Sequence, residues 1–200
     1  MIKRQVDRSR PRVVIGRDGR ISGPVVQDLV VASLRSVGID VIDLGLSTTP
    51  TVEVAVPLEN ADGGIILTAS HNPIEWNALK LLNSAGEFLD AEAGAEVLRL
   101  AEAEDFDYVP VLELGEVEQK NDYIDRHIER VLKLEGVDVK AIRKADFSVA
   151  VDGVNSTGGI AIPKLLEALG VRKVTALYCE PTGHFPHNPE PLAEHLTDLS

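Results

Sequence analysis

Gly63-Gly-Ile-Ile-Leu-Thr68 is the stretch that decides the fold. Its apolar residues are continuous rather than alternating, which predicts a strand buried on both faces of a sheet. Two further short apolar runs, Arg12-Val-Val-Ile-Gly16 and Asp40–Leu44, lie upstream. The segments between the three runs carry apolar residues at helical spacing. Strands that alternate with helices in this way predict an α/β fold with mixed, mostly parallel sheets and helices packed on both faces.

The remaining elements of the first half follow from the same patterns. Ser22 is a candidate N-cap for a helix that ends at Gly38, and Thr49 begins a second helix that ends near Asn60. Beyond the deciding strand we predict a strand over Ala78–Leu82, a turn over Asn83–Gly86 and a helix over Ala91–Glu104.

The pattern weakens between residues 105 and 115, which indicates a boundary. We therefore predict two similar α/β modules, residues 1–116 and 117–200, of which the second is incomplete. In the second module we expect helices over Gln119–Leu134, Gly158–Leu169 and Pro191–Leu199, and strands over Asp146–Val151 and Lys173–Tyr178. Because the packing pattern begins at residue 12 and stops within a predicted helix, we also expect both ends to be truncated.

Composition excludes several classes of protein. The 20 Lys and Arg residues against 32 Asp and Glu give a net charge of −12, which disfavours binding to nucleic acid or to an anionic membrane surface. No stretch approaches the roughly 20 apolar residues that span a bilayer. Cys179 is the single cysteine, so a disulfide within the chain is excluded. We expect a cytoplasmic protein.

The loop Thr68-Ala-Ser-His-Asn-Pro73 directly follows the deciding strand. Ligands of open α/β sheets bind beyond the carboxyl ends of the strands, so a site is expected here. The hydroxyl of Ser70 could attack phosphorus or carry a phosphoryl group, which His71 and Asn72 could orient. The alternative is an ordinary polar turn, which Ser, Asn and Pro favour on their own.

Two cationic positions could serve the same loop. Lys80, on the strand that returns beside it, could act as an acid/base or as a fixed cation, although a solvent-facing strand position is an equally good interpretation. Gly16-Arg17-Asp18-Gly19-Arg20 follows the first strand, and its two arginines could hold phosphate while Asp18 orients a guanidinium. The alternative for this turn is a surface charge cluster, which contributes little.

Other polar segments are better explained structurally. Asp152–Gly159 is rich in glycine but lacks the spacing of a phosphate-binding loop, so we predict a structural turn. His184 and His187 lack a third ligand that would complete a metal site. Trp76 is expected to pack the Ser70 loop against the sheet.

Taken together, these motifs resemble the α-D-phosphohexomutase superfamily, which comprises phosphoglucomutases, phosphomannomutases and phosphoglucosamine mutases. The Thr68–Pro73 loop is similar to the family's active-site serine loop at every position, and Trp76–Lys80 to its continuation. The Gly16–Arg20 turn resembles the family's Gly-x-Asp-x-Arg motif, and Gly183–Pro191 a loop of its second domain. The resemblance spans nearly the whole chain.

The resemblance implies a role for each residue of the loop. Ser70 would carry the phosphate and Lys80 would act as acid/base, with His71 as a further catalytic residue. Arg17, Arg20 and Asn72 would bind substrate phosphate. It also implies a hexose 1,6-bisphosphate activator and Mg²⁺ held through the phosphate on Ser70, with the aspartate ligands outside this chain.

The family's N-terminal arginine segment, its Mg²⁺-binding aspartate loop and the loops of its third and fourth domains have no counterpart in the sequence. We therefore expect a fragment of a phosphohexose mutase with little or no activity by itself. The run Ile74–Lys80 is most similar to phosphoglucosamine mutases. The alternatives are a serine hydrolase, which lacks a Gly-x-Ser-x-Gly elbow, and a non-catalytic sugar-phosphate-binding or self-associating module.

Overall fold

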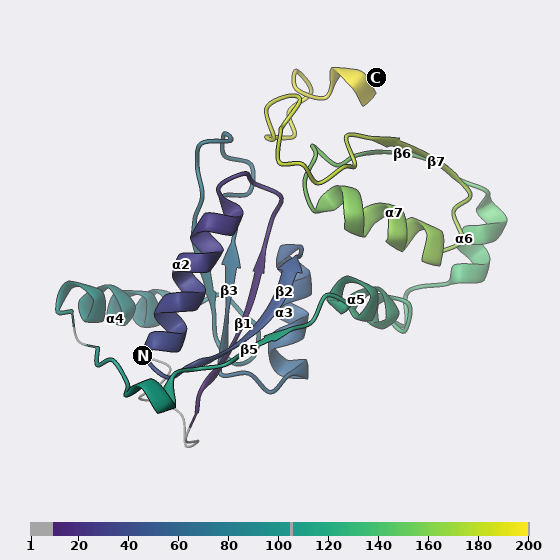
Figure 1. Ribbon diagram of the computed structural model, residues 1–200. Helices are drawn as coiled ribbons and strands as arrows, with labels where there is room; N and C mark the ends of the chain where they lie inside the picture. The colour runs from purple at the N-terminus through teal and green to yellow at the C-terminus, as the bar shows by residue number, and fades with distance from the viewer. Residues whose placement is uncertain (1–9, 105, 200) are drawn as a thin grey trace.

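The computed structural model describes residues 10–104 and 106–199 (Figure 1). Five strands form one sheet in the order β4-β3-β1-β2-β5. Every neighbouring pair is parallel except β3 and β4, which are antiparallel. The strands are β1 (Arg12–Arg17), β2 (Asp40–Leu46), β3 (Gly63–Leu67), β4 (Leu79–Leu82) and β5 (Val117–Gln119).

Helices cover both faces of this sheet, as the sequence predicts. Helix α2 (Gly23–Ser36) packs its apolar side chains against a cluster that includes Ile15 and Leu67. Helix α3 (Thr49–Leu58) covers the other face, where Val52 and Val56 contact a second cluster. Because β1 and β3 are covered from both sides, their apolar runs need no polar alternation.

Local sequence signals set the ends of these helices. Pro24 stands in the first turn of α2, and Gly38, with φ +79°, follows its last turn. Helix α4 (Ala91–Glu102) begins at Asp90, whose carboxylate accepts a hydrogen bond from the Ala93 amide at 2.8 Å.

The second module contains a two-stranded parallel sheet of β6 (Ser148–Asp152) and β7 (Lys173–Leu177). Helix α7 (Gly158–Ala168) packs on it, and α5 (Tyr123–Val131) contacts both α3 and α7. Figure 1 shows this part to the upper right of the first sheet, joined to it through α5. The predicted α/β class with a mostly parallel sheet is confirmed.

Three sequence predictions differ from the structure. The helix expected over Gln119–Leu134 is shorter, because residues 117–119 pair with β2 as strand β5 before the chain turns into α5. Helix α6 (Val139–Ala145) was not predicted, although Asp138 caps it through the amides of Lys140 and Ala141. The α-helix expected over Pro191–Leu199 is wrong.

In that C-terminal segment only the short 3-10 helix η2 (Thr197–Leu199) forms. Within it the Leu199 amide donates to the Leu196 carbonyl at 3.1 Å, and just before it the His195 amide donates to the Leu192 carbonyl at 2.9 Å, three residues back rather than four. The Glu190 carbonyl, which the Glu194 amide would bond in an α-helix, instead accepts the Leu192 amide and faces the ring Nδ1 of His195, both at 2.8 Å, which explains the difference. The module boundary at residues 116/117 stays a prediction. No helix in the described part of the chain is both long and apolar enough to cross a membrane.

Candidate active site

Ser70 stands on the loop that leaves β3 at the carboxyl edge of the first sheet. Its backbone lies in the left-handed region, with φ +56°, and the residue is exposed. A residue other than glycine holds this conformation only where surrounding contacts fix it. The loop therefore presents a serine hydroxyl to solvent on a backbone that must be held in place.

The group that holds this backbone is the guanidinium of Arg20, which is fully buried. Its Nη2 donates to the carbonyls of Ser70 and Asn72 at 2.9 and 2.8 Å. Its Nη1 donates to the carbonyls of Pro73 and Trp76 at 2.7 and 2.8 Å. The fifth donor, Nε, bonds Asp18 Oδ2 at 3.1 Å. All five N–H groups of the side chain are used.

Asp18 and Thr68 complete a buried polar network beneath the loop. The Thr68 hydroxyl donates to Asp18 Oδ2 at 2.7 Å and accepts the amide of Ser70 at 3.0 Å. Asp18 Oδ1 accepts the Arg20 amide at 3.0 Å. Each buried polar group in this network has a partner, which is the condition under which such a network rigidifies a site.

This arrangement corrects the role expected for Arg20. A guanidinium whose five donors already bond carbonyl and carboxylate oxygens has none left for a phosphate. The contacts of Arg17 differ from those of Arg20. Arg17 is half-buried, and its Nε bonds Gln27 Oε1 at 2.8 Å while Nη1 bonds the Asp18 carbonyl at 3.2 Å.

The other predicted site residues lie around the same loop. His71 and Asn72 are exposed on it, and the Asn72 side-chain amide donates to the Ala69 carbonyl at 2.7 Å. Lys80 lies on β4, where it pairs with Ile66 of the strand that leads into the loop. Its ammonium is 5.9 Å from the centroid of the Phe88 ring. The catalytic and binding roles of these residues stay predictions.

Trp76 does not pack the loop against the sheet, because its residue is 63% exposed. The loop is instead fixed through its backbone by Arg20 and through Asn77, whose side-chain amide donates to the Ser22 hydroxyl at 3.1 Å. Ser22 makes no side-chain cap to helix α2, so the predicted N-cap serine serves the loop. The spacing of apolar residues along a sequence does not indicate which main-chain carbonyls a side chain will bond. The sequence analysis therefore did not predict how the loop is held.

The glycine-rich turn is structural, as predicted. A Cβ on Gly159 would lie 2.5 Å from the Cys179 Cα, and one on Gly153 would lie 2.6 Å from the Gly159 Cα. Close backbone packing therefore requires both glycines. The turn also reaches the first module, because the Gly19 amide donates to the Ser156 hydroxyl at 3.0 Å.

His187 pairs with the carboxylate of Asp152. Its Nε2 lies 2.8 Å from Asp152 Oδ2 and its Nδ1 lies 2.8 Å from the Asn188 carbonyl oxygen. Both ring nitrogens face acceptors, so the protonated imidazolium satisfies both. Burial lowers the pKa of His187, but the hydrogen bonds to Asn188 and Asp152 outweigh burial and raise it above 6.5.

The described residues do not by themselves form the implied magnesium site. No group of three or more His, Cys, Asp or Glu side chains among residues 10–104 and 106–199 is arranged to hold a metal. Ser70, exposed at the loop tip, remains the residue through which a phosphate could contact an ion.

Fold and site together define an α/β protein that presents a serine at the carboxyl edge of a mostly parallel sheet. Residues 1–108 match the model of phosphoglucomutase/phosphomannomutase, alpha/beta/alpha domain I, and residues 122–200 match domain II of the same family. The chain belongs to the phosphoglucomutase/phosphomannomutase family.

Relatives cover nearly the whole chain. A Thermococcus kodakarensis protein named "Phosphoglucomutase/phosphomannomutase" is 44% identical over 197 residues, which is 98% of this chain and 42% of that protein. A Pyrococcus abyssi protein named "Probable phosphoglucosamine mutase" is 36% identical over 94% of this chain and 40% of its own length. The chain thus spans about two-fifths of the length of these relatives.

Solved structures agree with the fold. The crystal structure of a phosphoglucomutase/phosphomannomutase family protein from Burkholderia thailandensis aligns with a TM-score of 0.74 at 25% identity, covering 99% of this chain and 43% of that one. A Thermus thermophilus protein aligns with a TM-score of 0.81 at 24% identity, over 99% of this chain and 44% of its own.

Proposed function

We propose that this chain is part of a phosphohexomutase that interconverts hexose 6-phosphate and hexose 1-phosphate, with Ser70 as the residue that carries the phosphoryl group. The observation that carries the proposal is the Ser70 backbone, held at φ +56° by a buried arginine while the residue stays exposed. Phosphoryl transfer depends mainly on positioning and charge neutralisation, and a rigid loop that presents an exposed serine serves that need.

In the first half of the reaction, a sugar hydroxyl oxygen forms a bond to phosphorus as the bond between phosphorus and Ser70 Oγ breaks. Lys80 and His71 are the groups we assign to take the proton from that hydroxyl and return one to Oγ. The bisphosphate then reorients, and its other phosphoryl group passes to Ser70. Arg17 and Asn72 would bind phosphate oxygens.

Magnesium, when bound, supplies charge neutralisation to the phosphoryl oxygens. In this proposal its contact with the chain is the phosphate on Ser70, and its carboxylate ligands come from outside the described residues. Hexose 1,6-bisphosphate serves as the activator that phosphorylates the serine.

The test is phosphopeptide mapping after incubation with a hexose 1,6-bisphosphate and Mg²⁺. The chain, its Ser70→Ala variant and the 44% identical Thermococcus kodakarensis relative are compared. We expect phosphate on the matching serine of the relative and none on the variant. If neither the relative nor this chain is phosphorylated while both bind sugar phosphate, the non-catalytic binding module replaces this proposal.

For the sugar, we propose glucosamine phosphate, because the run Ile74–Lys80 is most similar to phosphoglucosamine mutases. The 44% identical relative carries the names of the glucose and mannose enzymes, so those phosphates are the competing substrates. We also propose that the 200 residues alone turn over little or no hexose phosphate, since they span 42% of that relative. Turnover comparable to that of the relative would refute this.

We further propose small hexose phosphates as ligands rather than nucleic acid or membranes, because a net charge of −12 disfavours binding to either. A cytoplasmic location is also proposed, on the single cysteine and the lack of a long apolar stretch in the sequence. Self-association is a second proposal for the isolated chain. Its basis is exposed apolar surface on α2, where Val25 and Leu29 are 65% and 66% exposed one helical turn apart. A sedimentation series that shows a monomer at every concentration would exclude self-association.

A further inference from the structure

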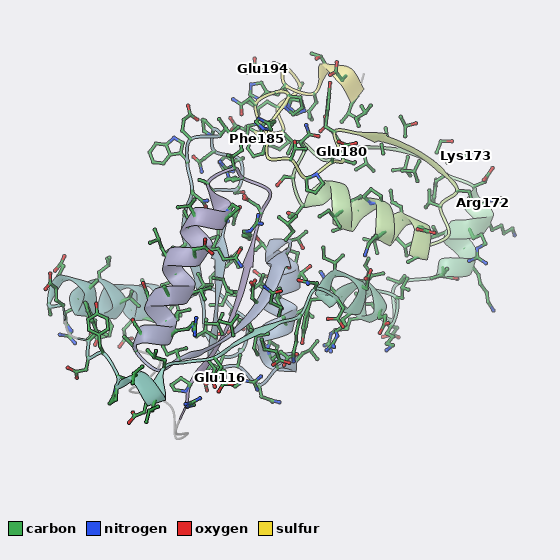
Figure 2. All side chains as sticks on the ribbon, in the orientation of Figure 1. Glu116, Arg172, Lys173, Glu180, Phe185 and Glu194 are labelled. Carbon is green, nitrogen blue, oxygen red and sulfur yellow. The ribbon has the colours of Figure 1, made fainter. Side chains whose placement is uncertain are left out.

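The Asp18–Arg20 turn is enclosed by two sets of loops. On one side it holds the Ser70 loop through Arg20. On the other side it contacts the glycine-rich turn and the Gly183–Phe185 segment of the second module. Figure 2 shows Phe185 at the place where the loops of the second module approach the first.

The contact on the second side is close. The Gly19 amide donates to the Ser156 hydroxyl at 3.0 Å. Gly183 is so near that a Cβ on it would lie 2.1 Å from the Gly19 carbonyl oxygen, and its φ of +74° suits glycine. The aromatic ring of Phe185 lies over the Arg20 guanidinium, 5.2 Å from its centroid to Cζ.

The two contacting segments are also fixed to each other. The Gly183 amide donates to the Asn155 carbonyl at 2.9 Å, and the Asn155 side-chain amide donates to the His184 carbonyl at 2.9 Å. A segment held in this way can restrain the ring of Phe185. The N–H groups at the edge of the Arg20 guanidinium all donate to the loop or to Asp18. Because the Phe185 ring lies against the face of the guanidinium, it restrains the orientation of the plane in which those donors lie.

We propose that Ser156 and Phe185 are positioning residues for the Ser70 loop, acting through the Asp18–Arg20 turn. Ser156 fixes the backbone of the turn, and Phe185 fixes the plane of the guanidinium. The second module then helps to set the geometry of Ser70 through Arg20. The catalytic meaning of this inference rests on the proposed function, whereas its structural content does not.

Trp76 is the single tryptophan of the chain, and its carbonyl accepts from Arg20, so its fluorescence reports on the loop directly. We would measure the anisotropy decay of Trp76 and hydrogen exchange of the amides in residues 68–78. The variants are Phe185→Leu, Ser156→Ala and the conservative Phe185→Tyr, each checked by circular dichroism. The matched control is Lys164→Ala. It removes the ion pair of Lys164 on α7 with Asp125 on α5, in which Nζ and Oδ1 are 2.8 Å apart, and neither residue belongs to the loop.

For Phe185→Leu and Ser156→Ala we expect a loss of residual anisotropy and roughly threefold to tenfold faster exchange in the loop, the size of change that a lost cation–π contact or a lost neutral hydrogen bond produces. Phe185→Tyr should retain wild-type values, and Lys164→Ala should leave the loop unchanged. Unchanged loop signals in folded Phe185→Leu and Ser156→Ala would overturn the proposal, as would an equal effect of Lys164→Ala. Because no readout uses phosphate, failure here is distinct from failure of the mutase proposal.

Discussion

Arg20 Nη2 donates to the carbonyl oxygen of Ser70 at 2.9 Å, although 50 residues separate the two in the chain. The guanidinium is fully buried, and its four hydrogen bonds to the loop all go to main-chain oxygens. The loop is therefore oriented by a cation beneath it while the side chain of Ser70 faces outward. Such an arrangement separates the group that positions the serine from the groups that would contact substrate.

Arg20→Lys should lose most of this restraint while keeping the charge. A lysine ammonium has three donors on a flexible stem and cannot reach four carbonyls and Asp18 in one plane. At least two of the five acceptors therefore lose their donor, and an unsatisfied buried acceptor costs about 1–3 kcal/mol, so we expect a decrease of at least that size in the free energy of unfolding. Urea denaturation measures it. Arg172→Ala, at an exposed pair with Asp146, is the matched control and should change stability by less than about 1 kcal/mol.

Gly183→Ala should destabilise the contact between the two modules. The new Cβ would lie 2.1 Å from the Gly19 carbonyl oxygen, and the φ of +74° disfavours any L side chain. We expect a lower thermal midpoint. Gly94→Ala is the control with the opposite expected sign. Gly94 lies inside helix α4, and a Cβ on it would meet nothing within 4 Å, so the substitution should stabilise the chain by about 0.5–1 kcal/mol. Equal midpoints for the two variants would contradict the packing described.

His187 should make stability depend on pH. Its pKa in the folded chain is raised above 6.5 because its bonds to Asn188 and Asp152 outweigh burial. A raised folded pKa contributes stability that is fully present below about pH 6.5 and is lost as pH rises through the folded value. The difference in unfolding free energy between the wild type and His187→Gln should therefore shrink above pH 6.5. A difference that grows with pH would show that the neutral ring is the favoured form.

Sequence patterns predicted much of the first sheet, because buried parallel strands leave continuous apolar runs. The run at Gly63–Thr68 falls on β3, and Arg12–Gly16 falls on β1. Strand β5 escaped prediction because its three residues are exposed and carry no apolar alternation. The expected C-terminal helix failed for a local reason, because the Leu192 amide and the His195 ring bond the Glu190 carbonyl that the first helical turn would use.

For the site, sequence identified the loop but not the way it is held. An arginine at the end of a strand usually faces solvent, which on sequence alone favours a phosphate-binding role for Arg20. Its burial depends on four carbonyls supplied by a loop at least 50 residues later, and main-chain acceptors leave no mark in a sequence. The same holds for Ser156 and Phe185, which reach the site only through the tertiary fold.

Glu59, which follows helix α3, should make the free energy of unfolding decrease in acid. Its carboxylate accepts from Lys120 Nζ at 2.8 Å and from the Tyr123 hydroxyl, and its side chain is 10% exposed. Burial raises the pKa of Glu59, but these hydrogen bonds and the charge of Lys120 outweigh it and lower the pKa below 4.5. A depressed folded pKa contributes stability that is present above about pH 4.5 and lost as pH falls through the folded value.

Glu59→Gln keeps the shape of the side chain but removes the charge. We expect it to destabilise the chain by about 1.5–3 kcal/mol at about pH 7, the range for hydrogen bonds to charged groups, and by less as the pH falls below about 4.5. Urea denaturation at about pH 7 and about pH 4 measures both values. Asp125→Asn, at the exposed pair with Lys164, is the control and should change little at either pH. If Glu59→Gln cost the same at both pH values, shape rather than charge would explain the contribution of Glu59.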